Sequence, residues 1–366
     1  MRIGLIIYGS LDTLSGGYLY DRRLVEYLRR EGDQVEVISL PWRSYIPHLA
    51  DNLAPDLHRR LAGLRVDLLL QDELNHPSLF WLNSRLRRQV RYPIVSIVHH
   101  LRSSEPRPAW QNRFYGAIER RYLESVGGFI FNSKTTRQVV RSVAGDGRPS
   151  LVAHPAGDRL DPAITAEEIA ARARQPGPLR LFFLGNVIPR KGLHVLIAAL
   201  RHLADHAWHL SIGGDCASDP AYAARMMRQV HAANLSERIQ FLGPLKERQL
   251  AAQLRTSHLL VLPSLYEGYG IAYLEGMSFG LPAVASTGGA AHEIITSGMN
   301  GFLVEPGDSR ALARCLGTLL KDRRRLVDMS LNARHRFLTH PTWDQTTRRI
   351  RNFLSDLSTR SRDQHD

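Results

Sequence analysis

Two glutamates stand eight residues apart in a segment whose pattern indicates a strand, a glycine turn and a helix. Glu267 comes shortly after the apolar run Leu259–Leu262, and Glu275 follows the range Gly268–Gly270. The glycines let the backbone approach a ligand, and a helix N-terminus offers unpaired N–H groups suited to a phosphate. A carboxylate that accepts two hydrogen bonds suits the vicinal hydroxyls of a ribose. The segment therefore predicts a site for a phosphate-linked sugar, although either glutamate alone would be better explained as a surface or capping residue.

Two histidines end another apolar run. His99 and His100 follow Ile94–Val98, and if this run is a strand they lie at the edge where ligands bind in open α/β sheets. A structural or capping role is the alternative for His99. Gly16 and Gly17 precede the first amphipathic stretch, but they do not form G-x-G-x-x-G, and no acidic residue stands alone after a second strand. A dinucleotide-dependent dehydrogenase is therefore not expected.

Short apolar runs alternate with amphipathic stretches, which predicts parallel sheets wrapped by helices. The expected strands of the first part are Ile3–Tyr8, Gln34–Leu40, Asp67–Leu70, Ile94–Val98 and Gly128–Phe131, and its first helix is Tyr18–Arg30. The alternation then starts again, with expected strands Leu179–Leu184, Trp208–Ile212, Ile239–Leu242 and Leu259–Leu262. The chain should therefore hold two α/β domains, which also suits its 366 residues.

A polar, alanine-rich stretch with several prolines separates the two alternations. It runs from about Asp158 to Pro178 and predicts the linker between the domains. We expect an N-terminal domain over residues 1–165, a C-terminal domain over residues 178–342 and a terminal helix over residues 343–366. The polar residues from Ser358 onward predict a frayed end.

The segment around the two glutamates resembles the E-x7-E signature of family 4 retaining glycosyltransferases, which have the GT-B fold, and weaker matches follow the family's order over most of the chain. By this resemblance Glu267 contacts donor-sugar hydroxyls and Glu275 holds the ribose. It also implies that backbone amides at the helix start meet the diphosphate, namely those around Gly268, Tyr269, Gly270 and Ile271. In such a fold two Rossmann-like domains face each other across a cleft, and the C-terminal helix crosses back to the N-terminal domain.

The loop after Leu184 is similar to the G-R-x4-K-G loop of the same family. By this resemblance Lys191 neutralises the leaving diphosphate, a task that a positioned cation performs without a metal. Asn186 stands where the family has an arginine, so either Arg190 compensates or Lys191 acts with less help. A helix-entry loop with incidental basic residues is the alternative.

Three further residues receive roles from the resemblance alone. It places His99 near the reacting centre, and it assigns Gly16 and Gly17 to the glycine-rich loop that approaches the donor phosphate. The N-terminal domain would hold most of the acceptor. The segment Asn132-Ser133 is expected to be supporting architecture.

The function implied is that of a hexosyltransferase that moves a sugar from an NDP-sugar to a hydroxyl acceptor with retention, without a metal or another cofactor. UDP- or GDP-linked donors are expected, with a glycan, a lipid-linked molecule or a small molecule as acceptor, in polysaccharide or glycoconjugate biosynthesis. The donor sugar, the acceptor and the oligomeric state do not follow from the sequence. The alternatives are a nucleotide-sugar epimerase, a glycan phosphorylase, or a non-catalytic nucleotide-sugar-binding partner, which Asn186 favours.

The chain is basic, with a formal net charge of +13, and part of the excess lies in one stretch with interleaved aromatic residues. The arginines of this stretch are Arg85, Arg87, Arg88, Arg91, Arg102, Arg107, Arg113, Arg120 and Arg121. Such a surface attracts phosphate groups, and we expect contact with an anionic membrane rather than with nucleic acid. A solvated basic face, with the aromatic residues in the core, is the alternative.

Cysteine content and hydropathy set the expected compartment. Cys216 and Cys315 are too few for a disulfide framework and lack the spacing of a metal site. No run approaches the roughly 20 apolar residues that span a bilayer. We therefore expect a cytoplasmic protein, with peripheral contact to the inner face of the membrane as an open alternative.

Overall fold

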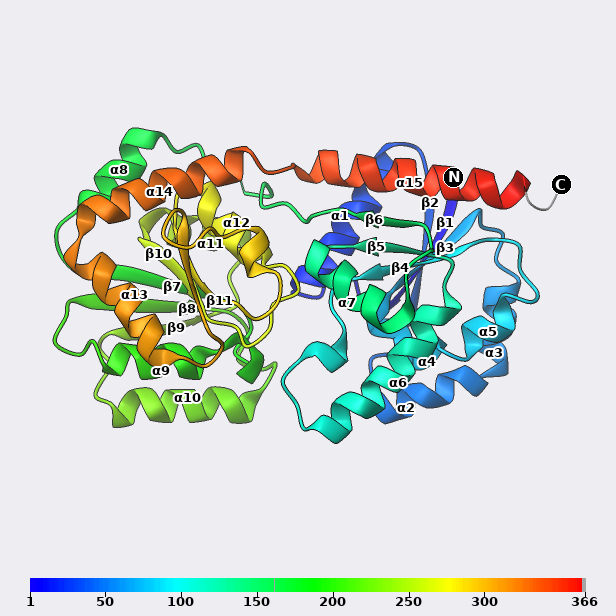
Figure 1. The fold of residues 1–366 in the computed structure, drawn as a ribbon, viewed down its shortest axis with the longest axis horizontal. Helices are drawn as coiled ribbons and strands as arrows, with labels where there is room; N and C mark the ends of the chain where they lie inside the picture. Colours follow the sequence, from blue (N-terminus) through cyan, green and yellow to red (C-terminus); the bar gives the residue numbers. More distant parts are fainter. Residues whose placement is uncertain (161, 364–366) are drawn as a thin grey trace. The chain divides into compact units, whose positions relative to one another are not determined.

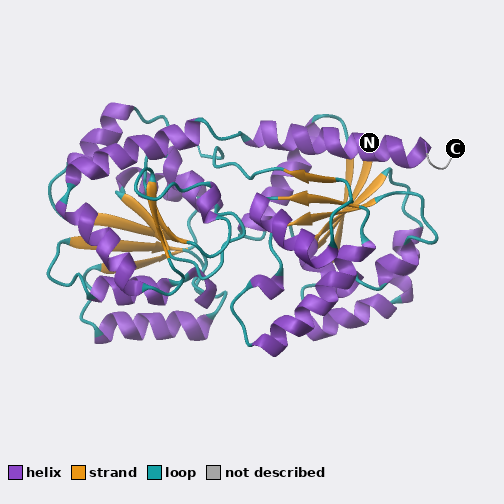
Figure 2. Ribbon diagram, in the orientation of Figure 1, coloured by secondary structure: helices purple, strands orange, loops and turns teal. Residues whose placement is uncertain are grey.

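The computed structural model of the protein describes residues 1–160 and 162–363. Its chain divides into two compact units, each described here by itself. Unit 1 comprises Met1–Pro155 and Pro341–Asp366, and unit 2 comprises Ala156–His340. Each unit holds a six-stranded sheet with helices around it (Figures 1 and 2).

The sheet of unit 1 is parallel and has the strand order β2-β1-β3-β4-β5-β6. Its strands are β1 (Arg2–Tyr8), β2 (Gln34–Leu40), β3 (Leu68–Asp72), β4 (Ile94–Val98), β5 (Gly128–Phe131) and β6 (Ser150–Val152). Because β2 lies on one side of β1 and the later strands lie on the other, the order reverses between β1 and β3. Ligands of open α/β sheets bind at the carboxyl edge beside such a switch point.

Helices cover this sheet, and strands β3 and β4 are buried along their whole length, as expected for a parallel sheet covered on both faces. The helices of unit 1 are α1 (Gly16–Arg30), α2 (Tyr45–Leu49), α3 (Pro55–Ala62), α4 (His76–Leu79), α5 (Leu82–Leu86), α6 (Ala109–Ser125), α7 (Lys134–Ala144) and α15 (Trp343–Asp363).

The last helix, α15, packs on α1 within unit 1 (Figure 1). Ile350 and Leu354 are fully buried, and Arg351 Nε donates to Asp33 Oδ2 at 2.7 Å. The predicted fraying from Ser358 is wrong, because the helix continues to Asp363 and Ser358 itself is buried. The polar residues of this segment suggested an exposed end, but a serine hydroxyl can be buried on a packed helix face. Residues 364–366 lie outside the described residues.

The sheet of unit 2 is also parallel and has the order β12-β11-β10-β7-β8-β9. Its strands are β7 (Leu179–Leu184), β8 (Trp208–Gly213), β9 (Ile239–Gly243), β10 (Leu259–Leu262), β11 (Ala283–Ser286) and β12 (Gly301–Val304). Counted from β7, this is the order 3-2-1-4-5-6 of a Rossmann fold, whose switch point lies between its first and fourth strands. The neighbours β7 and β10 therefore flank the switch point of unit 2.

The helices of unit 2 are α8 (Ala166–Arg174), α9 (Leu193–Arg201), α10 (Pro220–Ala232), α11 (Glu247–Thr256), α12 (Ile271–Ser278), α13 (Ser309–Lys321) and α14 (Arg323–Leu338). The first of them corrects the predicted linker, since α8 stands inside it and packs on α14. Thr165 and Glu168 form a capping box, and Ile169 and Ala173 are fully buried. Unit 2 accordingly begins at Ala156, and an alanine-rich composition had hidden an amphipathic helix.

The predicted α/β class with two Rossmann-like sheets is confirmed. The strands β6, β11 and β12 were not predicted; β6 has only three residues and none of them is fully buried. Among the described residues, no helix combines the length and the apolar character needed to cross a membrane.

Candidate active site

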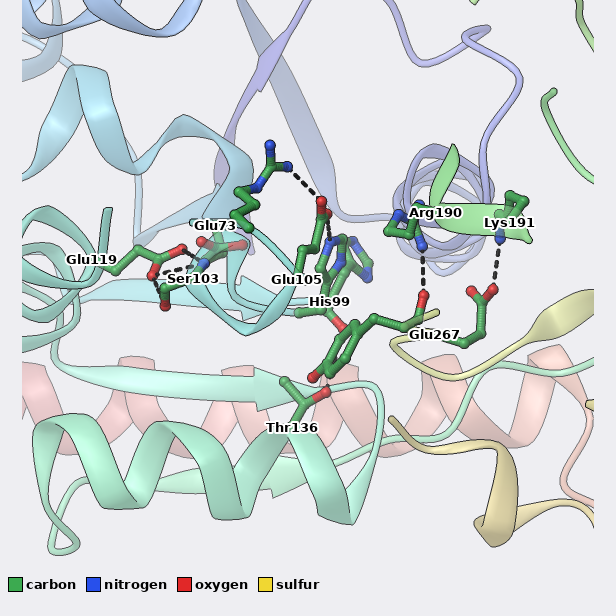
Figure 3. A network of polar contacts seen from close by, with 12 residues as sticks. Glu73, His99, Ser103, Glu105, Glu119, Thr136, Arg190, Lys191 and Glu267 are labelled. Atoms are coloured by element: carbon green, nitrogen blue, oxygen red, sulfur yellow. Dashed lines mark hydrogen bonds and ion pairs between the residues drawn. The ribbon is translucent and has the colours of Figure 1, made fainter. Parts of the chain in front are cut away.

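A cluster of hydrogen-bonded polar side chains lies at the switch point of unit 2. Lys191 ends the loop after β7, and Glu267 lies in the loop after β10. Lys191 Nζ donates to Glu267 Oε2 at 2.6 Å (Figure 3). Ser264 Oγ donates to the same oxygen at 3.1 Å. Because both donors reach Oε2, Oε1 is the oxygen that remains for a ligand hydroxyl.

The surroundings of Glu267 favour its ionised form. Burial alone would raise the pKa of this carboxyl group, but the positive charges of Lys191 and Arg190 and the hydrogen bonds from Lys191 and Ser264 outweigh it. The pKa of Glu267 therefore lies below its ordinary value. A carboxylate in this state accepts hydrogen bonds and supports positive charge, but it does not donate a proton at neutral pH.

Arg190 stabilises the same loop through its backbone and its side chain. Leu265 N donates to Arg190 O at 2.7 Å, and Arg190 NH1 donates to Tyr266 O at 3.0 Å. Part of the guanidinium is thus engaged by the Glu267 loop, while its charge acts on the Glu267 carboxyl group. Arg190 therefore lies beside the Glu267 loop, and the predicted compensation for the missing arginine at Asn186 stays a prediction.

The Glu267 loop also requires glycine at a neighbouring turn. Gly289 has φ +95°, and a Cβ atom there would lie 2.1 Å from the carbonyl oxygen of Glu267. Glu267 N donates to Gly288 O at 2.9 Å, which ties the two turns together. These glycines were not predicted to belong to the site, although a glycine pair shortly after the apolar residues Ala283–Ala285 was a usable signal.

The backbone predicted to meet the diphosphate forms the start of α12. Gly268 and Tyr269 are buried, and Gly270 is the N-cap with φ +102°. A Cβ atom at Gly270 would lie 2.3 Å from the ring of Tyr273, so only glycine fits. No side chain caps this helix at Gly270, and Ile271 is its first residue. An uncapped helix N-terminus of this kind suits a phosphate group.

Glu275 is the fifth residue of α12, and its hydrogen-bond partner differs from those of Glu267. Its Oε1 accepts a hydrogen bond from Arg159 Nε, and its side chain is 4% exposed. The two glutamates of the signature thus have different cationic partners in unit 2. Arg159 was not predicted, because it lies 116 residues away in sequence.

In unit 1 the structure brings Gly17 and His99 together. Gly16 and Gly17 are the first residues of α1, and Ser15 caps that helix. A Cβ atom at Gly17 would lie 3.1 Å from Cδ2 of His99, so a larger residue would crowd the imidazole. Asn132 Nδ2 donates to His99 O at 2.8 Å, which agrees with the supporting role expected of that segment.

The imidazole of His99 faces buried carboxyl groups of unit 1. Its Nε2 lies 3.4 Å from Oδ1 of Asp21, a fully buried residue of α1. Burial would lower the pKa of His99, but Asp21, then Asp72 and Glu73, raise it to about 9. Burial first, and then the charge of Asp21, raises the pKa of Asp72. Both pKa shifts therefore favour the protonated forms of His99 and of Asp72.

This cluster predicts that stability decreases at alkaline pH. The pKa of His99 in the folded state exceeds its ordinary value of 6.5, so the stabilisation is complete below about pH 6.5 and is lost towards pH 9. The raised pKa of Asp72 acts in the same direction, because the folded state holds this proton more tightly. The melting temperature should fall by several degrees between pH 6.5 and pH 9, and Asp21→Asn should flatten this dependence.

Thermal unfolding at a series of pH values measures the effect. His209→Asn, which changes an exposed histidine of β8, is the matched control and should melt with the pH dependence of the wild type. An Asp21→Asn variant whose melting temperature falls as steeply as that of the wild type would show that the pair does not stabilise unit 1.

A second buried cluster lies next to His99 in unit 1 (Figure 3). Ser103 N donates to the carboxylate of Glu119, and burial raises the pKa of Glu73 to about 7. Two sets of described residues place three ligand atoms within 4.8 Å of one another, as a metal site would require; they are Asp21, Asp72 and His99, and Glu73, His76 and Glu119. Both sets lie in unit 1. In unit 2, the positive charge beside Glu267 comes from Lys191 and Arg190.

The chain is similar in sequence and in fold to known glycosyltransferases. Residues 165–336 match the family model "Glycosyl transferases group 1". The chain is 28% identical to a phosphatidyl-myo-inositol mannosyltransferase of Mycobacterium leprae, over 88% of each chain. It is 30% identical to a GDP-mannose-dependent alpha-(1-6)-phosphatidylinositol monomannoside mannosyltransferase of Mycolicibacterium smegmatis, over 65% of each. The solved structure of sucrose-phosphate synthase from Thermosynechococcus elongatus has a TM-score of 0.82 at 20% identity, covering 97% of this chain and 98% of that one.

The two Rossmann-like sheets have the GT-B fold, and a paired lysine and glutamate lie at the switch point of the second sheet. The match to the model of the glycosyl transferases group 1 family extends over unit 2 almost from end to end. The protein is accordingly an enzyme of the hexosyltransferase type.

Proposed function

We propose that the protein transfers a hexose from an NDP-sugar to a hydroxyl acceptor, with retention at the anomeric carbon and without a metal. The observation that carries this proposal is the contact between Lys191 and Glu267 at the switch point of unit 2. The uncapped start of α12, where a diphosphate would bind, follows Glu267 closely in the sequence. Lys191, the partner of Glu267, is the cation that a leaving diphosphate needs.

The two side chains divide the work. Lys191 Nζ stabilises the negative charge that develops on the leaving diphosphate, and Oε1 of Glu267 accepts hydroxyl hydrogen bonds from the transferred sugar. As the bond to the leaving oxygen breaks, positive charge develops on the sugar, and the ionised Glu267 supports it. The acceptor oxygen attacks from the face that the diphosphate leaves, and the diphosphate takes the acceptor proton.

For the donor we propose a GDP-linked hexose, with UDP-linked sugars as the alternative. The support is the similarity to the GDP-mannose-dependent relative. For the acceptor we propose an inositol-bearing headgroup, because the name of the similar mannosyltransferase contains phosphatidyl-myo-inositol. The hydroxyl groups of such a ring are acceptors of the required chemical class.

A thermal-shift panel of GDP-, UDP-, ADP- and TDP-sugars tests the donor. A ligand at roughly 100 times its Kd adds about 2.7 kcal/mol to the free energy of unfolding, so the true donor should raise the melting temperature. Stabilisation by no member of the panel would contradict the proposal. An epimerase would convert the donor with no acceptor present, a phosphorylase would depend on phosphate, and a non-catalytic partner would bind without turnover.

We also propose that a surface of unit 1 contacts anionic membranes. Trp42 and Ile46 are each 63% exposed, Trp110 is 68% exposed, and Phe114 is 39% exposed. Tyr45 of α2 lies 6.0 Å from the Phe114 ring of α6, so these two helices are neighbours. We call these four exposed residues, together with the exposed Arg113 of α6, the α2–α6 surface.

The basic stretch partly supports this surface. Arg113 is exposed on α6 between Trp110 and Phe114, whereas Arg102 and Arg107 turn inward and stack on the Tyr115 ring. The predicted aromatic residues are therefore divided between the surface and the core, where Tyr122 is fully buried.

Changes on the α2–α6 surface should weaken binding to vesicles that contain anionic lipid. Each basic residue near such a membrane contributes about 1 kcal/mol, so Arg113→Glu should weaken binding by tenfold or more, and salt should weaken it further. Trp110→Ala should also weaken it. Vesicle co-sedimentation measures the effect, with Arg324→Glu, on an exposed position of unit 2, as the charge-matched control. Salt-independent binding, or none, would contradict membrane contact.

A further inference from the structure

Arg159 connects two carboxylates of unit 2. Its Nε donates to Oε1 of Glu275, and its NH1 lies 3.4 Å from Oε1 of Glu247, at the start of α11. The side chain of Arg159 is 19% exposed and that of Glu247 is 61% exposed. A nearly buried carboxylate on α12 therefore has a mostly buried cation as its partner, and a surface carboxylate holds the other end of that cation.

The backbone that carries Arg159 is packed directly on the helix that carries Glu275. A Cβ atom at Gly157 would lie 2.5 Å from Cβ of Leu274 and 2.9 Å from N of Glu275. On the other side of Arg159, Leu160 is 5% exposed and belongs to the core of unit 2. The guanidinium thus extends from a backbone segment that is fixed against α12.

We propose that Arg159 is a positioning residue of the donor site, which holds Oε1 of Glu275 and thereby presents Oε2 to the ribose hydroxyls. This inference rests on the proposed function and on the role that the family resemblance gives Glu275, which is to hold the ribose of the donor. A carboxylate fixed before the ligand arrives loses less conformational freedom on binding. Arginine suits the task because its planar group donates to two carboxylates in different directions, which lysine does not reproduce.

Nucleotide binding tests this role without an acceptor. The Kd values of GDP and UDP, and of their 2′-deoxy forms, are measured by calorimetry, and the better nucleotide is used for the variants. Wild type should prefer the ribonucleotide. Arg159→Ala should raise its Kd about tenfold and bring the ratio between deoxy and ribo forms close to one. Arg159→Lys should lie between, and Arg248→Ala, which removes a neighbouring exposed arginine, should match the wild type.

The ratio of the two Kd values remains informative even if a variant is partly unfolded, because the folded fraction affects both nucleotides equally. If Glu275→Gln loses the ribose preference while Arg159→Ala keeps both the affinity and the preference, the positioning role is wrong. Tighter binding by Arg159→Ala would equally overturn it, since Arg159 would then compete with the ribose. If Glu275→Gln behaves as the wild type, or no nucleotide binds, the proposed donor site itself is wrong, and the role of Arg159 with it.

Discussion

Replacing Lys191 by alanine is expected to lower kcat for sugar transfer by about 10²–10³-fold, the usual effect of removing one group that stabilises developing negative charge. Lys191 is the side chain that contacts Glu267 at the switch point of unit 2. Without it, the charge on the leaving diphosphate would be stabilised only by backbone N–H groups and by Arg190. Initial rates of NDP release, with donor and acceptor both saturating, measure the loss.

The control for this variant is Lys321→Ala, which removes an exposed lysine at the end of α13 in the same unit. Its kcat should equal that of the wild type. Because Arg190 lies beside the same carboxylate, the double variant Lys191→Ala with Arg190→Ala should lose more activity than the single variant. A Lys191→Ala enzyme with an unchanged kcat would remove Lys191 from the mechanism.

Replacing Glu267 by alanine should lower kcat/KM by about 10²-fold, since a hydrogen bond to a charged group contributes about 1.5–3 kcal/mol. The variant loses the acceptor for the sugar hydroxyls and leaves Lys191 without its carboxylate partner. Glu267→Gln should retain part of the activity, because its amide oxygen still accepts a hydrogen bond but no longer supports positive charge. Steady-state kinetics with varied donor separate the two effects.

Glu305→Ala, at an exposed position after β12, is the matched control and should keep the wild-type kcat/KM. Thermal unfolding of Glu267→Ala without ligand checks that the loop at Gly288 and Gly289 remains folded. Equal kcat/KM for Glu267→Ala and wild type would mean that this carboxylate does not contact the transferred sugar.

The strands could be predicted where short runs rich in apolar residues alternate with amphipathic stretches. The strands β2, β4, β5, β7 and β10 begin and end at the predicted residues. The apolar runs of β4, β5 and β10 are characteristic of strands buried on both faces of a parallel sheet. The short strand β6 has no fully buried residue and gave no signal, and α8 was hidden by its alanine content. The order of the strands required the structure, because their pairing joins residues far apart in the sequence.

The candidate site shows the same division. The contact between Lys191 and Glu267 joins two predicted loops, one found from the glycines that follow Glu267 and the other from its resemblance to the G-R-x4-K-G loop. The partners of Glu275 and His99 were missed for different reasons. Arg159 has no local pattern linking it to Glu275, whereas Asp21 lies on the same helix face as Leu24 and Leu28, where an acidic residue was a visible signal. The catalytic and binding roles of these residues stay predictions.

The transfer reaction itself tests the central claim most directly. The protein is incubated in EDTA with GDP-mannose or UDP-glucose and with phosphatidylinositol vesicles, and proton NMR follows the anomeric signals while NDP is assayed. The expected result is one NDP released for each glycosylated acceptor, with the anomeric configuration of the donor kept. A product of inverted configuration, or conversion of the donor into another nucleotide sugar without NDP release, would contradict a retaining, metal-independent glycosyltransferase.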